Sequence, residues 1–183
     1  MTELDVAIRS AEPTEYPLVG ELLVRAYDNI SDAVIDPDYN RELGDVAGRV
    51  DAALVLVALL EGVVVGSITY VDGGPLAELS ALHEAEIRMF AVDSTVRGKG
   101  IGAALLAACV DLARRDGRER LWLSTSPWMK DAQRLYERFG FRRVPTRDRQ
   151  EPSSGQMFEL WAYLLEPIPE PRSTAQQCTR GGL

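Results

Sequence analysis

The sequence contains few of the residues that build disulfide frameworks and metal centres. Its 183 residues include two cysteines and one histidine. Cys109 falls on the apolar face of a predicted helix and Cys178 lies in a polar C-terminal segment, so neither indicates a disulfide framework. His83 lies in a connection before a predicted strand, which favours a surface position. We therefore expect no metal ion and no disulfide framework.

Long hydrophobic runs are also missing. No uncharged apolar stretch is long enough to span a membrane, and the N-terminal Met-Thr-Glu-Leu-Asp lacks the basic and then apolar layout of a signal peptide. With 46% hydrophobic and 26% charged residues, the composition suits one globular domain with a sizeable core. We expect a cytoplasmic protein that contacts no membrane, with a domain over residues 1–166 and a disordered tail over residues 167–183.

The chain is short of positive charge, with a net charge of −8. General nucleic-acid binding is disfavoured because affinity for phosphates needs a basic surface. The charge is also uneven: residues 1–83 have fifteen acids and four bases, whereas residues 104–150 have six acids and eleven bases. Such a division can serve two ligands of opposite sign, or it can reflect ordinary solvated faces.

The spacing of apolar residues predicts a mixed α/β chain. Helices are expected over residues 13–27, 43–50, 101–116 and 129–139. Strands are expected over residues 6–9, 54–60, 63–71, 85–92, 121–125, 141–144 and 157–165, with a loop over 145–155. The strand, helix, strand unit over residues 85–125 predicts two parallel strands that are neighbours or near neighbours. Regular alternation would place Glu84, Glu86, Arg88 and Phe90 on one face of their strand.

The turn between the strand ending at Val92 and the following helix reads Arg97-Gly98-Lys99-Gly100-Ile101-Gly102-Ala103. Glycines in such a turn let backbone N–H groups approach a ligand, and the N–H groups at a helix start have no partner within the helix. Turns of this kind bind anions, phosphates above all. A dinucleotide fingerprint, G-x-G-x-x-A, also fits, but residues 93–97 separate it from the strand, and the next strand ends at Thr125 without an acid. A pyrophosphate turn is favoured over a dinucleotide site or a simple turn.

Two segments resemble the GNAT (Gcn5-related) N-acetyltransferases, over roughly residues 4–166. EIRMFAVDSTVRGKGIGAALL resembles the central motif of the family, with Arg97, Gly100 and Gly102 at the specified positions of its Q/R-x-x-G-x-G/A loop. AQRLYERFGF resembles the family segment A-x-x-L-Y-E-x-x-G-F. The resemblance implies a single α/β domain with a mixed, mostly antiparallel sheet of about six to seven strands and about four helices.

The resemblance implies that acetyl-CoA is the co-substrate. The backbone of Phe90 to Val92 would pair with the pantetheine arm and offer an N–H to the oxyanion formed on attack. The N–H groups of Gly98 to Ala103 would bind the pyrophosphate, with Arg97 and Lys99 adding charge. The implied cofactor-binding residues are Phe90, Ala91, Val92, Arg97, Gly98, Lys99, Gly100, Ile101, Gly102 and Ala103. Many members have Asn where this chain has Met129, which leaves that cofactor contact open.

Two residues carry the implied chemistry. Tyr136 corresponds to the family tyrosine that protonates the departing thiolate, because the pKa of a phenol is near that of the thiol; it can also be a core aromatic. Glu86 aligns with the glutamate that several members use to accept the proton of the amine; it can also be a carboxylate paired with Arg88 or with solvent. Ser126 can bond the cofactor or acceptor, or serve as a turn residue, and Trp128 can line the acceptor cleft or pack in the core.

The resemblance implies transfer of acetyl to a primary amine of a small molecule or protein, by direct attack and without metal or covalent intermediate. The alternative is a non-catalytic acyl-CoA-binding sensor or structural domain. Residues 28–51 have seven acids against two arginines and edge the acceptor cleft in the family, which predicts a cationic acceptor. The same acids can instead cap helices and keep the protein soluble. The sequence does not distinguish a monomer from a homodimer.

Overall fold

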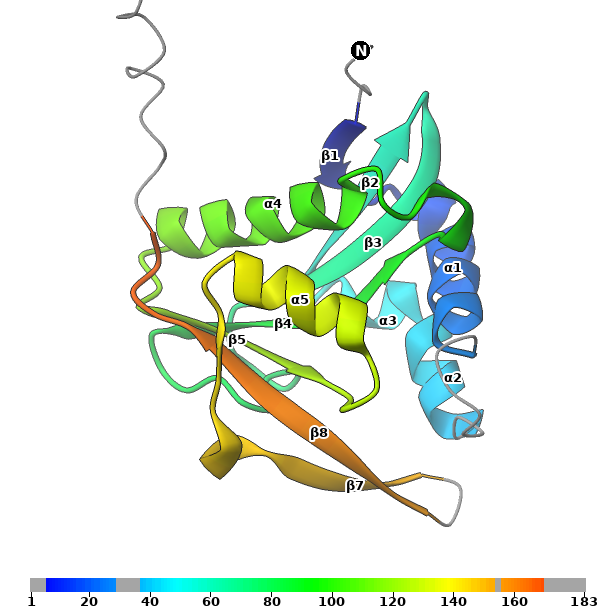
Figure 1. Ribbon diagram of the computed structural model, residues 1–183. Coiled ribbons are helices and arrows are strands. Elements are labelled where there is room, and N and C mark those ends of the chain that lie inside the picture. Colours follow the sequence, from blue (N-terminus) through cyan, green and yellow to red (C-terminus); the bar gives the residue numbers. More distant parts are fainter. Residues whose placement is uncertain (1–5, 29–36, 154–155, 170–183) are drawn as a thin grey trace, which may run out of the picture.

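The computed structural model describes residues 6–28, 37–153 and 156–169 as one twisted sheet with helices on both faces (Figure 1). Some predictions fall outside these residues: the disorder of residues 170–183, the reading of Cys178, and the two acids Asp32 and Asp36 of the acceptor region. Within the described part, no helix is long and apolar enough to cross a membrane.

The described residues form eight strands in the order β1-β2-β3-β4-β5-β8-β6, and β7 pairs with β8 outside this row. Their bounds are β1 Val6–Ser10, β2 Leu54–Leu60, β3 Val63–Val71, β4 Glu84–Val92, β5 Arg120–Thr125, β6 Arg142–Arg143, β7 Arg149–Ser153 and β8 Gln156–Leu165. All pairs are antiparallel except β4 with β5, which are parallel neighbours as the crossover predicts. The expected fold class, a mixed and mostly antiparallel sheet in one α/β domain, is confirmed.

Two apolar cores hold the helices against the sheet. The α-helices are α1 Tyr16–Asp28, α2 Pro37–Gly44, α3 Val46–Arg49, α4 Ile101–Arg115 and α5 Lys130–Arg138. The first core joins α4 and α5 to one face through Leu105, Leu123 and Tyr136. The second core holds α1, α2 and α3 against the other face, where Leu23 and Leu43 pack against β2 and β4. The site described below lies at an interruption in the sheet, which residues from both faces line.

β4 is interrupted by a bulge. Two of its residues, Met89 and Phe90, lie opposite the single residue Ile68 of β3, and Met89 has a φ of 47°. The bulge shifts the alternation of side chains, so Phe90 packs into the α4 core together with Ile87, while Met89 packs into the α1 core. The prediction that Phe90 shares a face with Glu86 was therefore wrong, because it assumed an uninterrupted strand.

β4 and β5 part soon after they pair. Their ladder runs over four residue pairs, from Glu84 with Arg120 to Ile87 with Leu123, and does not continue along the rest of either strand. The C-terminal half of β4 therefore has β3 on one side and no strand of the described residues on the other. Backbone groups on this open side lack a strand partner and can bind a ligand, although the backbone of Phe90 hydrogen-bonds the Tyr27 hydroxyl.

The segment expected to be a loop contains a strand. Residues 149–153 form β7, which pairs with β8 from Arg149 opposite Leu160 to Ser153 opposite Gln156. Polar residues and Pro152 concealed this strand, and both are tolerated because β7 has a partner on one side only. Conversely, the strand expected over residues 141–144 is reduced to β6, and the helix expected over 43–50 is divided between α2 and α3.

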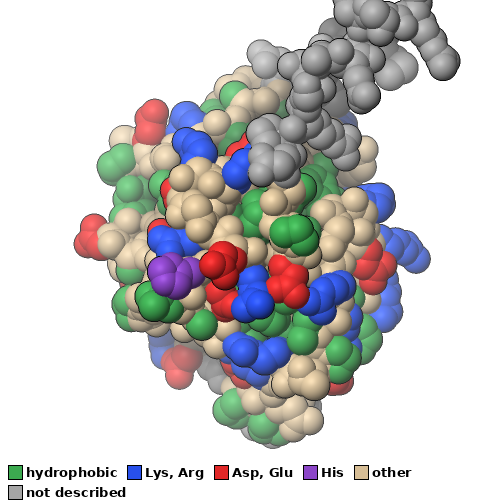
Figure 2. Space-filling model, turned by 90° about the vertical axis from the view of Figure 1, so that its left-hand side faces the viewer, with side chains coloured by type: hydrophobic (Ala, Val, Ile, Leu, Met, Phe, Trp, Pro, Cys, Tyr) green, Lys and Arg blue, Asp and Glu red, His purple; other side chains and the backbone are tan. Residues whose placement is uncertain are grey.

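The acidic and basic halves of the sequence meet in ion pairs. Arg118 pairs with Asp72, and Arg149 pairs with Glu78 at 2.7 Å. Arg120 and Arg142 both form ion pairs with Glu166. On the face of the molecule toward the C-terminal end of α4, acidic and basic side chains are accordingly interspersed around the single histidine (Figure 2). Part of the charge division seen in the sequence therefore serves ion pairs between the two segments.

Candidate functional site

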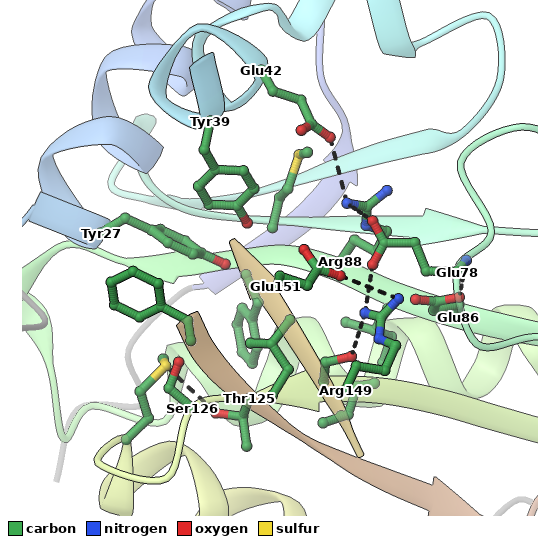
Figure 3. Close-up of a pocket in the computed structure, with 18 of the residues that line it drawn as sticks. Tyr27, Tyr39, Glu42, Glu78, Glu86, Arg88, Thr125, Ser126, Arg149 and Glu151 are labelled. Atoms are coloured by element: carbon green, nitrogen blue, oxygen red, sulfur yellow. Dashed lines mark hydrogen bonds and ion pairs between the residues drawn. The ribbon is translucent and has the colours of Figure 1, made fainter. Parts of the chain in front are cut away.

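A cavity of about 450 Å³ opens where β4 and β5 part (Figure 3). Its floor is formed by residues 86–90 of β4 and residues 123–126 at the end of β5. The walls come from α1 and α2 on one side and from α5 and the β7–β8 hairpin on the other. Three of the predicted site residues, Glu86, Phe90 and Tyr136, line this one cavity.

Tyr136 reaches the cavity from α5 and is 4% exposed. Its ring packs among aromatic neighbours, with centroids 6.4 Å from Phe90, 6.1 Å from Phe141 and 6.0 Å from Tyr163. Burial raises the pKa of its hydroxyl well above the ordinary value, so the group is protonated at neutral pH. Among the described residues this hydroxyl has no hydrogen-bond partner. A buried, protonated and unpaired phenol in a cavity can donate a proton to a bound group.

Glu86 is 1% exposed and holds a loop in place. Its Oε2 accepts hydrogen bonds from the backbone N–H groups of Glu78, Leu79 and Ser80, at 2.9, 2.8 and 3.2 Å. No described residue donates to Oε1. The pair with Arg88, one of the alternatives for Glu86, is absent from the described contacts, since that arginine binds Glu42 and Glu78. Glu86 thus has one oxygen committed to the loop and one available.

Five charged side chains form a continuous chain along the cavity wall (Figure 3). Arg88 contacts Glu42 of α2 at 3.4 Å and also pairs with Glu78. Glu78 contacts Arg149 of β7 at 2.7 Å, and Arg149 lies 3.5 Å from Glu151. The chain alternates in sign and has a carboxylate at each end. We call it the ion-pair chain.

Two tyrosines approach the floor from the helices. The rings of Tyr27 in α1 and Tyr39 in α2 meet edge to face, with centroids 6.0 Å apart. Figure 3 shows both hydroxyls pointing into the cavity. Burial raises the pKa of both groups, and the backbone of Phe90 and the hydroxyl of Tyr39 partly offset this effect at Tyr27. Both phenols are therefore protonated at neutral pH.

The glycine turn lies outside the lining of this cavity, before α4. Gly98 and Gly100 have φ values of 78° and 82°, a region that favours glycine, and Gly100 caps the N-terminus of α4. No atom lies within 4 Å of the position that a Cβ would take at either residue. Gly102 differs, because a Cβ there would contact Leu135 at 3.4 Å and Phe90 at 3.5 Å. The turn is thus open toward solvent and packed against α5 on its other side.

The remaining predicted residues divide between cavity and surface. Ser126, Trp128 and Met129 line the cavity, and the sulfur of Met129 accepts a hydrogen bond from the Thr125 hydroxyl at 3.5 Å. His83 is exposed, as expected. Ala91 and Val92 do not contribute to the lining, and neither do residues 97–103. No cluster of metal-ligating side chains occurs in the part of the chain that the structure describes.

Sequence reasoning missed most of the cavity wall. Tyr27 and Tyr39 had no motif, and Glu78, Arg149 and Glu151 lay in segments expected to be connections. The contact between Glu78 and Arg149 joins residues 71 positions apart. A pairing over this separation leaves no local signal. The strand character of β7 was the one feature that could have pointed to it.

Known proteins with similar sequences and folds include acetyltransferases. The profile of the "Acetyltransferase (GNAT) family" matches residues 18–141. The chain is 35% identical over 80 residues to N-alpha-acetyltransferase 30 of Saccharomyces cerevisiae, covering 44% of this chain and 46% of that protein. It is 35% identical over 88 residues to N-acetylaspartate synthetase of Danio rerio, covering 48% of this chain and 29% of that protein. The chain thus spans less than half the length of these curated relatives.

A solved structure extends the likeness to the whole fold. The putative acetyltransferase yncA of Salmonella typhimurium, determined with its cofactor acetyl-CoA, superposes with a TM-score of 0.66 at 22% identity, covering 92% of this chain and 96% of that one. At this identity the match speaks for the fold. The profile match extends over about two thirds of the chain and includes the bulged strand, the glycine turn and Tyr136. The chain belongs to the acetyltransferase (GNAT) family.

Proposed function

We propose that the protein is an N-acetyltransferase that moves acetyl from acetyl-CoA to a primary amine by direct attack. The observation that carries the proposal is the interruption between β4 and β5, which brings a buried, unpaired Tyr136 hydroxyl into one cavity with strand backbone that β5 does not pair. Membership of the family and the acetyl-CoA bound in yncA support the co-substrate. The amine acceptor and a cytoplasmic location are predictions.

The glycine turn fits a pyrophosphate. The space at the Cβ positions of Gly98 and Gly100 is open, so a phosphate can approach the backbone there. The first N–H groups of α4 follow directly and have no partner within the helix. Arg97 and Lys99 add positive charge beside the turn. The N–H groups of Gly98 to Ala103 would hold the pyrophosphate, and the open side of residues 90–92 would hold the pantetheine arm.

The reaction needs two proton transfers. Acetyl-CoA supplies a thioester, and the amine must lose a proton as the thiolate must gain one. We assign the second transfer to Tyr136, whose hydroxyl is protonated and has no competing acceptor among the described residues. We assign the first to Glu86, through the oxygen that the loop of residues 78–80 does not use. A water can bridge Glu86 to the amine.

The alternative function is an acyl-CoA-binding sensor without turnover. The two are distinguished by measuring free-thiol release from acetyl-CoA with a panel of amines that contains small monoamines, amino acids and peptides with a free N-terminus. We expect release that depends on an amine and on Tyr136. Tight acetyl-CoA binding with no amine-dependent release would reject catalysis and support the sensor. The panel also separates small-molecule from protein acceptors, since relatives of both kinds match the chain.

A further inference from the structure

We propose that the ion-pair chain selects an acceptor that is a cationic amine with an apolar body and that it rejects acceptors carrying a carboxylate. The proposal rests on the proposed acetyl transfer and names the substrate class of that site. Its elements are the alternating charges of the chain, the aromatic side chains that line the same cavity and the unpaired Tyr136 hydroxyl.

Both arginines in the cavity are already paired with carboxylates. Arg88 binds Glu42 and Glu78, and its Nη1 donates to the carbonyl of Leu76 at 3.0 Å. Arg149 binds Glu78 and Glu151. Its Nε has no partner but is inaccessible to solvent. A carboxylate on the acceptor would have to displace one of these glutamates and leave it unpaired, which is unfavourable in a partly buried site.

The ends of the ion-pair chain favour positive charge. Glu42 and Glu151 each share a single arginine with another glutamate, so the chain has three carboxylates and two guanidinium groups. Glu86 adds a further carboxylate to the floor. The local excess of negative charge attracts an ammonium group as the acceptor enters, and this group releases one proton to solvent before the neutral amine attacks.

Aromatic side chains also line the cavity beside the Glu151 end of the ion-pair chain, since Phe158 is the cross-strand partner of Glu151. Trp128, from the turn after β5, meets Phe158 of β8 edge to face, with ring centroids 6.1 Å apart. Trp128 lines the cavity and is 41% exposed. An exposed tryptophan beside a cavity offers a stacking surface for an apolar or aromatic body. Tyr136 lines the same cavity, packs against Phe90 of β4 and is 96% buried without a hydrogen-bond partner among the described residues, which marks the point where the reacting groups arrive.

The test compares 2-phenylethylamine with phenylalanine, which differ by one carboxylate. Their kcat/KM values are measured by thiol release in the parent protein. Phenylalanine amide, in which an uncharged carboxamide replaces the carboxylate, is one control, and spermidine is a cation without an apolar body. We expect phenylethylamine to exceed both phenylalanine and spermidine by at least about tenfold, with the amide close to phenylethylamine. Equal or better use of phenylalanine or spermidine would overturn the inference.

Variants connect the preference to the ion-pair chain. Glu42→Gln and Glu151→Gln each free one contact of an arginine, so the ratio of phenylethylamine to phenylalanine should fall at least about fivefold. Glu21→Gln, on the exposed face of α1, is the matched control and should leave the ratio unchanged. An unchanged ratio in both cavity variants would overturn the inference. If no amine on the panel releases thiol, the proposed function itself fails, which is a different result.

Discussion

Tyr136 combines two properties that a general acid needs, a retained proton and a free donor. Replacement by Phe removes the proton and keeps the ring among Phe90, Phe141 and Tyr163. We expect kcat to fall by about 10²–10⁴-fold while acetyl-CoA affinity changes little. Tyr70→Phe is the matched control, because this buried tyrosine bonds Asp116 at a site away from the cavity. Turnover of the Tyr136 variant within twofold of the parent would return this residue to a packing role.

The pH dependence of Tyr136 follows from its raised pKa. Because burial moves the pKa upward, the hydroxyl keeps its proton beyond the ordinary titration point of a phenol, at about pH 10. Loss of the acid therefore lies above that pH. We expect kcat to show no decline from this group between about pH 7 and 10. A decline in that range that disappears in Tyr136→Phe would contradict the assignment.

Glu86 has a structural and a proposed chemical role, which one substitution can separate. Gln keeps an oxygen that can accept the hydrogen bonds from residues 78–80 but cannot take up a proton. We expect Glu86→Gln to lower kcat by about 10²-fold with thermal stability near that of the parent. Glu86→Ala should lose both turnover and stability, because one buried and two partly buried N–H groups lose their acceptor. Full turnover in Glu86→Gln would make Glu86 a residue that positions the loop and nothing more.

At the scale of elements, the turn before α4 can be tested by its glycines. Gly100→Val adds a Cβ where the space is open and the φ is positive, so it blocks the approach of a phosphate and strains the backbone. Gly62→Val in the β2–β3 turn has similar strain, with a φ of 80° and open space, at a distance from the turn. We expect calorimetry to show weaker acetyl-CoA binding for Gly100→Val alone. Equal loss in both variants would remove the turn from the binding site.

The entry to α1 carries a pH-dependent contact. Arg9 of β1 donates to both carboxylate oxygens of Glu15, each at 2.7 Å, which lowers the pKa of Glu15. The stabilisation is present above the unfolded pKa near 4.3 and is lost as pH falls through the lower folded pKa. Glu15→Gln should reduce the free energy of unfolding by about 1 kcal/mol at pH 7 and by less below pH 4. Urea titrations at the two pH values measure the difference. A constant difference would contradict the ion-pair explanation.

The sequence predicted elements with strong periodicity and missed those defined by their partners. The strands on either side of α4, the glycine turn and the segment containing Tyr136 follow local rules of spacing and turn chemistry. The bulge at Met89 and the strand β7 do not, because the first depends on register against β3 and the second on pairing with β8. For the same reason the cavity floor could be predicted, whereas Tyr27, Tyr39 and Arg149 could not.

At the scale of the whole molecule, ligand binding should be visible as stability. A ligand that binds only the folded state, at about 100 times its Kd, stabilises it by about 2.7 kcal/mol. For a domain of this size that amounts to a rise in Tm of about 5–10 °C. We expect acetyl-CoA to give this rise and pantetheine, which lacks the pyrophosphate, to give much less at the same concentration. Equal shifts would show that the turn contributes little to affinity.

The interruption of the sheet also has a mechanical consequence. Strands β1 to β4 form one part of the sheet and β5 to β8 form the other. The four residue pairs of the β4–β5 ladder join the two parts through the sheet. These pairs are the junction between the two parts. Phe90 belongs to one part, and Tyr136 of α5 packs against it from the other. The angle between the two parts of the sheet therefore sets the distance from Tyr136 to the backbone of β4. We expect changes in packing at Ala85 or Leu121, which form one of these four pairs, to alter turnover without contact with either substrate.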